Sequence, residues 1–210
     1  MSSDFQSIIA SPVSAYAEGL RFFNGTGMLN DALSRLVRDL ERNEIEYAVI
    51  GAVALNQHGY HRFTEDIDLL LTRKGLEDFR EKLVGRGYRP AFEGATKKFR
   101  TTSENVPVEV ITEGEFPGDG LPKPVAFPAP ADVCETFAGV KTVSLEKLIE
   151  LKIASGISAS DRLKDLADVQ ELIKLKGLDG SFAKHLSEYV RPKFIELWTG
   201  VRDSRSERGE

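Results

Sequence analysis

Two aspartates one residue apart, directly in front of an apolar run, constrain this chain more than any other feature. The segment is RFTEDIDLLL, residues 62–71, and its second half is typical of a buried strand. Alternate side chains of a strand share a face, so Asp66 and Asp68 are expected on one face, ~7 Å apart, with Ile67 on the other. Two like charges at the mouth of an apolar strand repel unless a positive charge lies between them. The pattern therefore raises the hypothesis of a metal ion held by both carboxylates.

Composition narrows the class of protein. The chain has 210 residues, 41% hydrophobic and 29% charged, which suits one globular domain or a compact core with a helical extension. Its most apolar run, Tyr47 to Leu55, is too short to span a bilayer, and its start lacks the pattern of a secretory signal. The single cysteine, Cys134, excludes an internal disulfide and a cysteine-rich zinc site. We therefore expect a cytoplasmic protein with no membrane association.

The net charge of −5 argues against a broad nucleic-acid-binding surface. A local basic cluster remains at Lys97, Lys98 and Arg100, which we interpret as solvated surface. An acidic protein is still able to bind a polyphosphate or an RNA end through a metal ion and a few lysines.

The pattern along the chain predicts an α+β fold, with a small mixed sheet carrying the site and a helical C-terminal part beside it. The predicted divisions are an N-terminal arm at 1–27, loosely ordered, a core at 28–143, a helical subdomain at 144–200 and a charged tail at 201–210. Helices are expected at 28–43, 52–59, 75–88, 144–156 and 161–177, followed by a last helical stretch interrupted at Pro192. Strands are expected at 46–50, 66–72, 97–102, 106–112 and 137–143, and Pro107 belongs at a strand start or edge.

The junction Gly51-Ala52 is a candidate phosphate-binding site, because a strand ends and a helix begins there. Free N–H groups at a helix N-terminus suit a phosphate, and glycine leaves the approach unobstructed. Most strand–glycine–helix junctions are purely structural, and that alternative stays open for this one.

Glu109 in the run VPVEVI is the third candidate ligand. A carboxylate inside an apolar strand is costly to bury unless it is paired or bound to a metal. If this strand lies beside DIDLLL, Glu109 completes a group of three carboxylates with Asp66 and Asp68. Hard oxygen ligands of this kind favour Mg²⁺ or Mn²⁺, and such groups hold two divalent ions ~4 Å apart. The alternative is an exposed glutamate on an edge strand.

The run YAVIGAVALNQHGYHRFTEDIDLLL resembles the core motif of the polymerase-β-like nucleotidyltransferase superfamily, in particular the branch of the AbiEii-type toxins and related bacterial proteins. The family pattern is a strand, a glycine turn, a helix, an arginine and then an acidic pair separated by a hydrophobic residue. The positions that fill it are Gly51, Arg62, Thr64, Asp66, Ile67 and Asp68. The segment SLEKLIELKIASG and the later RLKDLADVQELI are similar to the family's helical part, so that the resemblance covers most of residues 30–175.

The resemblance implies roles for residues of both parts. Asp66 and Asp68 would be metal ligands with Glu109, Gly51 and Ala52 would cradle a nucleoside triphosphate, and Arg62 and Thr64 would belong to the same nucleotide site. Lys152 would reach the phosphates and Asp165 would support the site; their plain alternatives are a surface lysine and an ordinary helix-face charge. Two positions depart from the family pattern: Ala52 replaces the usual Gly or Ser, and Glu109 replaces the commoner aspartate.

The predicted reaction is Mg²⁺- or Mn²⁺-dependent transfer of a nucleoside monophosphate from an NTP to a hydroxyl of an acceptor. The acceptor classes left open are RNA such as a tRNA 3′ end, a protein and a small molecule such as an aminoglycoside. The resemblance also implies a role in toxin–antitoxin or phage-defence systems, with a separate antitoxin protein as partner. Three rival interpretations remain: a catalytically inactive nucleotide- or partner-binding relative, a metal-dependent hydrolase, and an interaction protein with incidental carboxylates.

Overall fold

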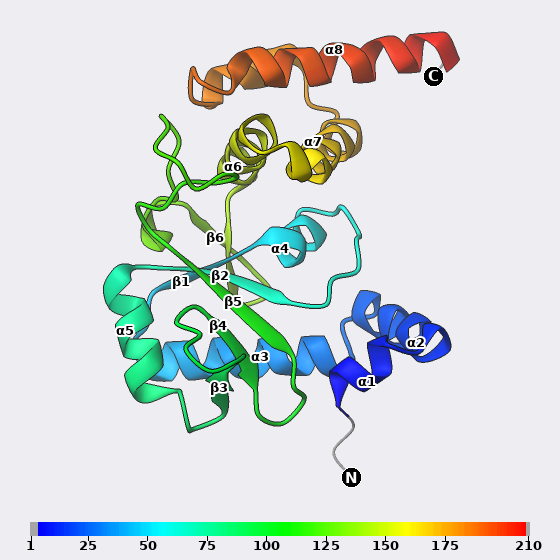
Figure 1. Cartoon of the computed structure of the whole chain (residues 1–210). Helices are drawn as coiled ribbons and strands as arrows, with labels where there is room; N and C mark the ends of the chain where they lie inside the picture. The colour runs from blue at the N-terminus through cyan, green and yellow to red at the C-terminus, as the bar shows by residue number, and fades with distance from the viewer. Residues whose placement is uncertain (1–3, 209–210) are drawn as a thin grey trace.

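The computed structural model describes residues 4–208, and the first three residues of the expected N-terminal arm and the last two of the expected tail lie outside this range. Figure 1 shows a mixed sheet with helices on both faces. The α+β prediction is confirmed. The helices are α1 (Phe5–Ile9), α2 (Pro12–Phe23), α3 (Met28–Arg42), α4 (Gly51–Gln57), α5 (Arg73–Lys82), α6 (Leu145–Ser158), α7 (Leu163–Lys176) and α8 (Arg191–Arg208). The strands are β1 (Tyr47–Ile50), β2 (Ile67–Leu71), β3 (Tyr88–Pro90), β4 (Lys98–Thr101), β5 (Pro107–Thr112), β6 (Cys134–Phe137) and β7 (Val140–Val143).

The sheet has the strand order β3-β4-β5-β2-β1-β7-β6. The central pair, β1 and β2, is antiparallel, while β2 pairs with β5 and β1 with β7 in parallel. The register places Asp68 opposite Ile50 on one side and Glu109 on the other. Residues paired in this way share a face of the sheet, so the parallel pairing of β2 and β5 brings Glu109 to the face that carries Asp68.

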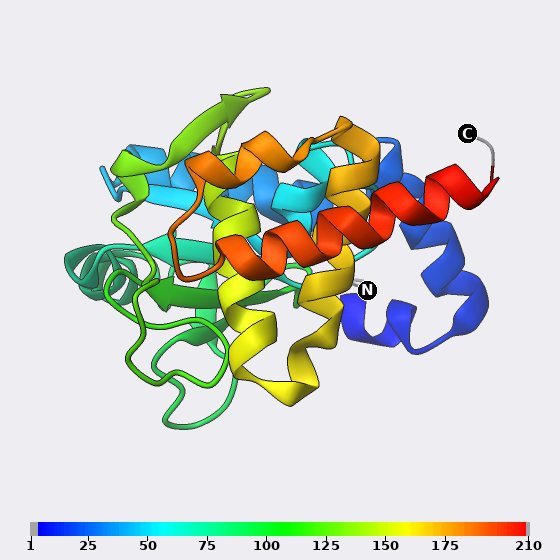
Figure 2. The same ribbon diagram turned by 90° about the horizontal axis from the view of Figure 1, so that it is seen from above.

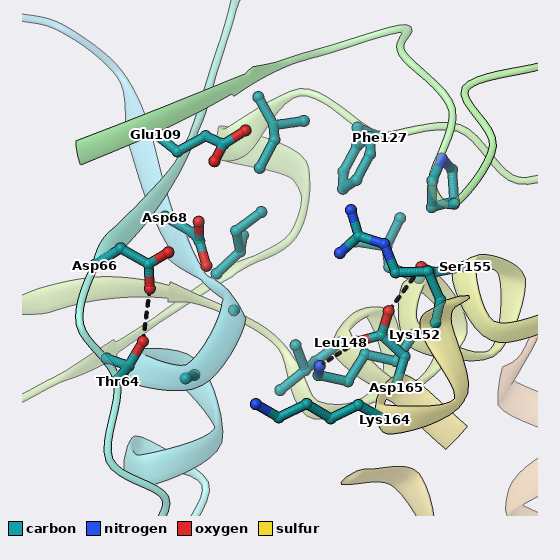
Figure 3. A pocket seen from close by; sticks show the side chains of 18 of the residues that line it. Thr64, Asp66, Asp68, Glu109, Phe127, Leu148, Lys152, Ser155, Lys164 and Asp165 are labelled. Atoms are coloured by element: carbon teal, nitrogen blue, oxygen red, sulfur yellow. Dashed lines mark hydrogen bonds and ion pairs between the residues drawn. The ribbon is translucent and has the colours of Figure 1, made fainter. Parts of the chain in front are cut away.

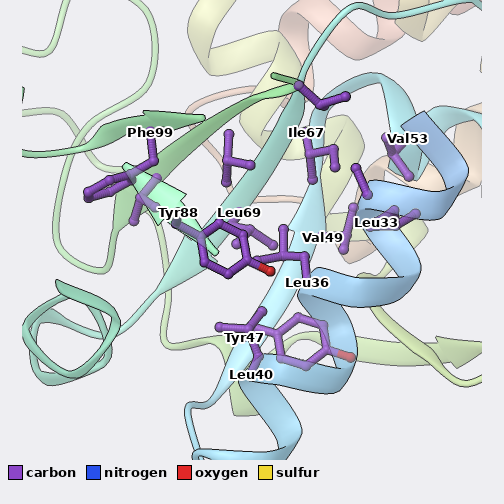
Figure 4. Packing of buried hydrophobic residues seen from close by; sticks show 14 of the residues in the cluster. Leu33, Leu36, Leu40, Tyr47, Val49, Val53, Ile67, Leu69, Tyr88 and Phe99 are labelled. Atoms are coloured by element: carbon purple, nitrogen blue, oxygen red, sulfur yellow. The ribbon is translucent and has the colours of Figure 1, made fainter. Parts of the chain in front are cut away.

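One face of the sheet packs on α3 and α5. Alternate residues of the central strands, such as Tyr47 and Val49 of β1 or Ile67 and Leu69 of β2, are fully buried there. Figure 4 shows how Leu33, Leu36 and Leu40 of α3 meet them from the other side. The spacing of these leucines gives α3 one continuous apolar stripe, which explains why the helix predicted at 28–43 forms.

The C-terminal helices cover the opposite face. Ile50, Leu70 and Val143 contact a second cluster built largely from α6, α7 and α8, and Figures 1 and 2 show these helices stacked above the sheet. Gly156 allows the closest approach of α6 and α7, since a Cβ there would lie 2.5 Å from Leu166 Cγ. The C-terminal helices do not extend over β3 and β4. On this face of the sheet, the side chains of these two strands are therefore open to solvent.

Several elements differ from the sequence-based expectations. The expected arm contains α1 and α2 in its described part, and Phe5 is fully buried in the first core cluster. The single strand predicted at 137–143 instead contains the turn and second strand of a hairpin, β6–β7. Ala138 and Gly139 both adopt positive φ and turn the chain between the two strands. Pro192 does not interrupt the last helix: it lies in the first turn of α8, where proline loses no hydrogen bond. None of the helices in residues 4–208 has the length and apolarity needed to cross a membrane.

Candidate nucleotidyltransferase site

A large pocket lies between the sheet and the C-terminal helices. Its volume is about 1020 Å³, and it is lined by residues from α4, the loop before β2, β5, the segment 114–120, α6 and the start of α7. Every residue proposed from the sequence lines it: Gly51, Ala52, Arg62, Thr64, Asp66, Asp68, Glu109, Lys152 and Asp165. One wall, from the sheet, carries carboxylates. The opposite wall, from the helices, carries Lys152, Arg162 and Lys164 together with Asp161 and Asp165.

The carboxylate wall is built by β2 and β5. Asp68 and Glu109 are direct partners in the parallel ladder, and Asp66 immediately precedes β2. Figure 3 shows all three carboxylates turned toward the same space. Thr64 Oγ1 donates a hydrogen bond of 2.6 Å to Asp66 Oδ1, which fixes the orientation of that carboxylate.

The three carboxylates do not yet form a closed group. Glu109 Oε1 lies 3.4 Å from the Lys98 ammonium on the neighbouring strand β4, and the two side chains are half-exposed. Among the described residues, no three histidine, cysteine, aspartate or glutamate side chains are arranged as a group that could hold a metal ion. The carboxylate wall therefore consists of the pair Asp66 and Asp68 and of Glu109, which forms an ion pair with Lys98.

Asp68 is the electrostatic centre of this wall. Burial, and next the negative charges of Asp66 and Glu109, raise the pKa of Asp68 from its ordinary value to about 7. Lys152 and Arg62 oppose that rise only in part. A cation bound between the carboxylates would relieve this repulsion, and the donors are all hard oxygens, so the residues fit Mg²⁺ or Mn²⁺.

Gly51 is required by the position of Asp68. Its φ is +65°, a backbone conformation that is costly for any residue with a Cβ. A Cβ built on Gly51 would overlap Asp68 Oδ2 and lie 2.9 Å from its Cγ. The sequence suggested that glycine leaves room for a phosphate; in the structure, the room at Gly51 is filled by the Asp68 carboxylate. Ala52 follows as a buried residue of α4.

Lys152 is held by two carboxylates of α7. Its ammonium lies 2.8 Å from Asp165 Oδ1 and 2.8 Å from Asp168 Oδ2, and both Lys152 and Asp168 are buried. Ser155 also donates to Asp165 Oδ2, at 2.7 Å. Burial alone would raise the pKa of Asp165, but the Lys152 charge and these two hydrogen bonds outweigh it and hold that pKa below its ordinary value. The network therefore joins α6 to α7.

Arg62 extends the same network to the sheet side. Its Nε lies 3.6 Å from Asp168 Oδ1 and is buried without a hydrogen-bond partner. Asp168 thus bridges Lys152 and Arg62, two cations from different parts of the fold. Asp168 was not among the site residues proposed from the sequence; its i+3 spacing from Asp165 was the signal that both would face Lys152.

Two further cations of the pocket were missed from the sequence. Arg162 and Lys164 line it from the α6–α7 connection and the first turn of α7, and both are exposed. In the described part of the chain, neither forms an ion pair within 4 Å. Figure 3 shows the Lys164 side chain reaching from the helical wall toward the strand wall. The motif RLKD was recognised only through Asp165, because nothing in the sequence distinguished a pocket lysine from a surface one.

Comparison with known proteins identifies the group to which the chain belongs. The family model described as "Nucleotidyl transferase AbiEii toxin, Type IV TA system" matches residues 31–194, which is more than half of the sequence. The chain belongs to the AbiEii family. The match confirms the resemblance inferred from the motif and supports a nucleotidyl transfer function.

The chain is also similar to solved structures of other proteins. The crystal structure of ANT(2″)-Ia in complex with adenylyl-2″-tobramycin has a TM-score of 0.50 and 14% identity, covering 83% of this chain and 98% of that one. An antigenic nucleotidyltransferase-like protein from Paracoccidioides brasiliensis has a TM-score of 0.45 and 17% identity, covering 69% of this chain and 75% of that one. No curated protein sequence matches the chain. At 14% identity, the likeness to ANT(2″)-Ia shows a shared fold only.

Proposed function

We propose that this AbiEii-family protein is a metal-dependent nucleotidyltransferase that moves a nucleoside monophosphate from an NTP to an acceptor hydroxyl. The observation that carries the proposal is the pairing of Asp68 with Glu109 across β2 and β5, with Asp66 beside them, in a pocket that Arg162 and Lys164 line from the opposite wall. Carboxylates suit the ions that neutralise a triphosphate, and separate cations suit the phosphates themselves.

Asp66 and Asp68 would hold the divalent ion, and Glu109 would join them once it leaves Lys98. The ion would supply charge neutralisation at the phosphates during in-line displacement. In the reaction the acceptor oxygen forms a bond to the α-phosphorus, the bond between the α-phosphorus and the bridging oxygen breaks, and pyrophosphate leaves. Glu109, half-exposed beside Lys98 at the rim, would accept the proton of the acceptor hydroxyl.

The cations of the opposite wall divide into two sets. The ammonium of Lys152 is already bonded to two carboxylates, so we assign Lys152, with Asp165, to holding α6 and α7 together behind the site. Lys164 and Arg162 have no such partners among the described residues, and we assign to them the contacts with the triphosphate. Arg62 belongs to both sets. Its Nε is buried beside Asp168 without a hydrogen-bond partner, and its side chain also lines the pocket. Because the Asp68 carboxylate fills the space beside Gly51, we keep as a proposed phosphate contact only the pocket-lining backbone of Ala52, at the start of α4.

The open face of β3 and β4 favours RNA among the acceptors. Lys98 pairs with Glu109 in the ladder, Arg100 lies two residues further on the same face, and Arg89 is the partner of Arg100. Asn105, a neutral residue, accepts hydrogen bonds from both arginines, while the charge of Asp4 beside it interacts with Arg100. A row of cations that leads away from the third carboxylate suits a phosphodiester backbone. A protein acceptor, an aminoglycoside-like small molecule and an antitoxin partner implied by the family description remain to be tested.

A catalytically inactive, nucleotide-binding relative is the second candidate. The pairing of Glu109 with Lys98 and the lack of a closed carboxylate group within residues 4–208 favour it. The discriminating experiment incubates the protein with Mg²⁺ and each α-labelled NTP, in the presence of total RNA, total protein or an aminoglycoside. An Asp68→Asn variant serves as the control.

A labelled acceptor that disappears in Asp68→Asn supports the transferase. Release of free nucleoside monophosphate without a labelled acceptor indicates a hydrolase. Binding of Mg-NTP by calorimetry without any incorporation indicates the inactive relative, and absence of both binding and incorporation contradicts the proposal.

A further inference from the structure

The segment between α4 and β2, residues 58–66, carries three of the proposed site residues without being a helix or a strand. Arg62 and Thr64 lie within this site loop, and Asp66 lies at its end. A loop that places ligands needs its backbone fixed by something outside itself, because an irregular segment has no repeating hydrogen bonds of its own.

Asn56, in the last turn of α4, supplies one side of that support. Its Oδ1 accepts a hydrogen bond of 3.0 Å from Arg62 N, and its Nδ2 donates one of 2.7 Å to Arg62 O. The same Nδ2 also donates to Ala52 O at 2.8 Å, which ties the side chain to α4. One amide side chain thus takes both backbone groups of Arg62, as a neighbouring strand would. Within residues 4–208, no other hydrogen bond reaches the backbone of residues 61–65.

Helix α2 supplies the other side through Phe63. The Phe22 ring meets the Phe63 ring edge to face, with centroids 5.7 Å apart and planes at 83°. A Cβ on Gly19 would lie 3.8 Å from Phe63 Cδ2, so the ring also packs against the α2 backbone. Phe63 itself lines the pocket between Arg62 and Thr64. Helix α2 is in turn fixed to α3, since the buried Glu18 accepts a hydrogen bond from Met28 N.

We propose that Asn56 and Phe63 are positioning residues of the nucleotide site, and that α2 is a working part of that site rather than an accessory arm. Asn56 fixes the backbone of Arg62 from the α4 side. The ring of Phe63, the next residue, packs against Phe22 on the α2 side. Together they set where the Arg62 guanidinium and the Thr64–Asp66 pair enter the pocket. Neither residue contacts the nucleotide through a polar group of its own. This inference rests on the proposed function, because it concerns how the same pocket binds Mg-NTP.

The test uses the full chain and four substitutions, Asn56→Ala, Asn56→Asp, Phe22→Ala and Tyr16→Ala. Tyr16 is the matched control, an aromatic residue on the same helix that is 71% exposed on its outer side. Three quantities are measured: amide hydrogen exchange across residues 60–66, the Kd for Mg-NTP by calorimetry, and the denaturation midpoint. Asn56→Asp is included because it keeps the acceptor for Arg62 N and loses the donor to Arg62 O.

We expect Asn56→Ala to speed exchange of the Arg62 amide at least ten-fold and to raise the Kd for Mg-NTP about ten-fold, with Asn56→Asp intermediate. Phe22→Ala should speed exchange across the site loop and raise the same Kd, whereas Tyr16→Ala should match the wild type in all three measurements. A fall in the denaturation midpoint with unchanged loop exchange and unchanged Kd would overturn the inference, because it would mark Asn56 and Phe22 as structural residues only.

The outcome separates from that of the proposed function. If the wild type binds Mg-NTP and the variants bind it equally well, only the positioning inference fails. If the wild type binds no NTP at all, the proposed function fails and the assigned positioning role fails with it, whatever the exchange rates are.

Discussion

Substitution of Gly51 by alanine should damage the site through Asp68 and not only through backbone strain. Gly51 has φ +65°, where an L-residue costs about 1–2 kcal/mol. The new Cβ would also overlap Asp68 Oδ2 and lie 3.1 Å from Asp68 Cβ, so the carboxylate must rotate away. A side chain forced off its preferred rotamer costs about 0.5–1.5 kcal/mol. We therefore expect Gly51→Ala to lower the free energy of unfolding by about 2–3 kcal/mol.

Gly85→Ala is the matched control for this experiment. Gly85 has φ +81°, and a Cβ there would meet no atom within 4 Å, so its substitution carries the backbone cost alone, about 1–2 kcal/mol. Denaturant unfolding of both variants isolates the contribution of Asp68, and the double variant Gly51→Ala/Asp68→Ala should recover most of it. Calorimetry should show that Gly51→Ala weakens Mg-NTP binding at least ten-fold while Gly85→Ala leaves it unchanged. Equal destabilisation by the two substitutions, together with wild-type NTP binding by Gly51→Ala, would refute the reasoning.

Four further substitutions test the assignments of charge in the pocket and beside it. Because the pKa of Asp68 is raised to about 7, ionisation of this carboxyl lowers the stability of the metal-free protein as the pH rises above about 4. A shift of this size corresponds to at most about 4 kcal/mol, and water in the pocket reduces the effect. In denaturant titrations without metal, the unfolding free energy of Asp68→Asn should therefore exceed that of the wild type by about 2 kcal/mol at pH 8 and by little at pH 4. Lys152→Met should lower the unfolding free energy by about 3–5 kcal/mol, since it leaves two aspartates facing each other. Lys164→Met should change the unfolding free energy by less than about 0.5 kcal/mol and weaken NTP binding about ten-fold. The reverse ranking of the two lysines in these assays would contradict their assigned roles. Lys98→Ala should weaken RNA binding similarly for all sequences and reduce the slope of log K against log salt by about one, and an unchanged slope would remove Lys98 from the RNA surface.

Periodicity predicted most elements of the core. The spacing of the leucines predicted helix α3, and the apolar run after Asp68 predicted strand β2. In both cases the pattern of buried residues is compatible with few other secondary structures. The position of Pro107 at the start of β5 also followed from its missing N–H. By contrast, α2 carries exposed apolar residues such as Val13 and Tyr16 beside the buried Phe22, so its pattern does not reveal which face is covered.

The site itself could be predicted only as far as sequence neighbours determine it. The aspartate pair is local, and its placement beside Glu109 followed from the guess that two strands are adjacent, which the parallel register of β2 and β5 bears out. The roles of Lys152 and Lys164 could not be told apart, since only the packed helices show which ammonium meets Asp165 and Asp168 and which remains open to the pocket. The pairing of Glu109 with Lys98 likewise depends on the cross-strand register of β4 and β5.

The central claim is that Asp66, Asp68 and Glu109 bind the divalent ion that accompanies an NTP. The most direct test is anomalous diffraction from crystals of the protein grown with Mn²⁺ and a non-hydrolysable NTP analogue. The account predicts a manganese peak within coordination distance of the Asp66 and Asp68 carboxylates, with Glu109 turned away from Lys98 and the triphosphate directed toward Lys164. A bound nucleotide whose manganese lies elsewhere, with Asp68 unliganded, would contradict it.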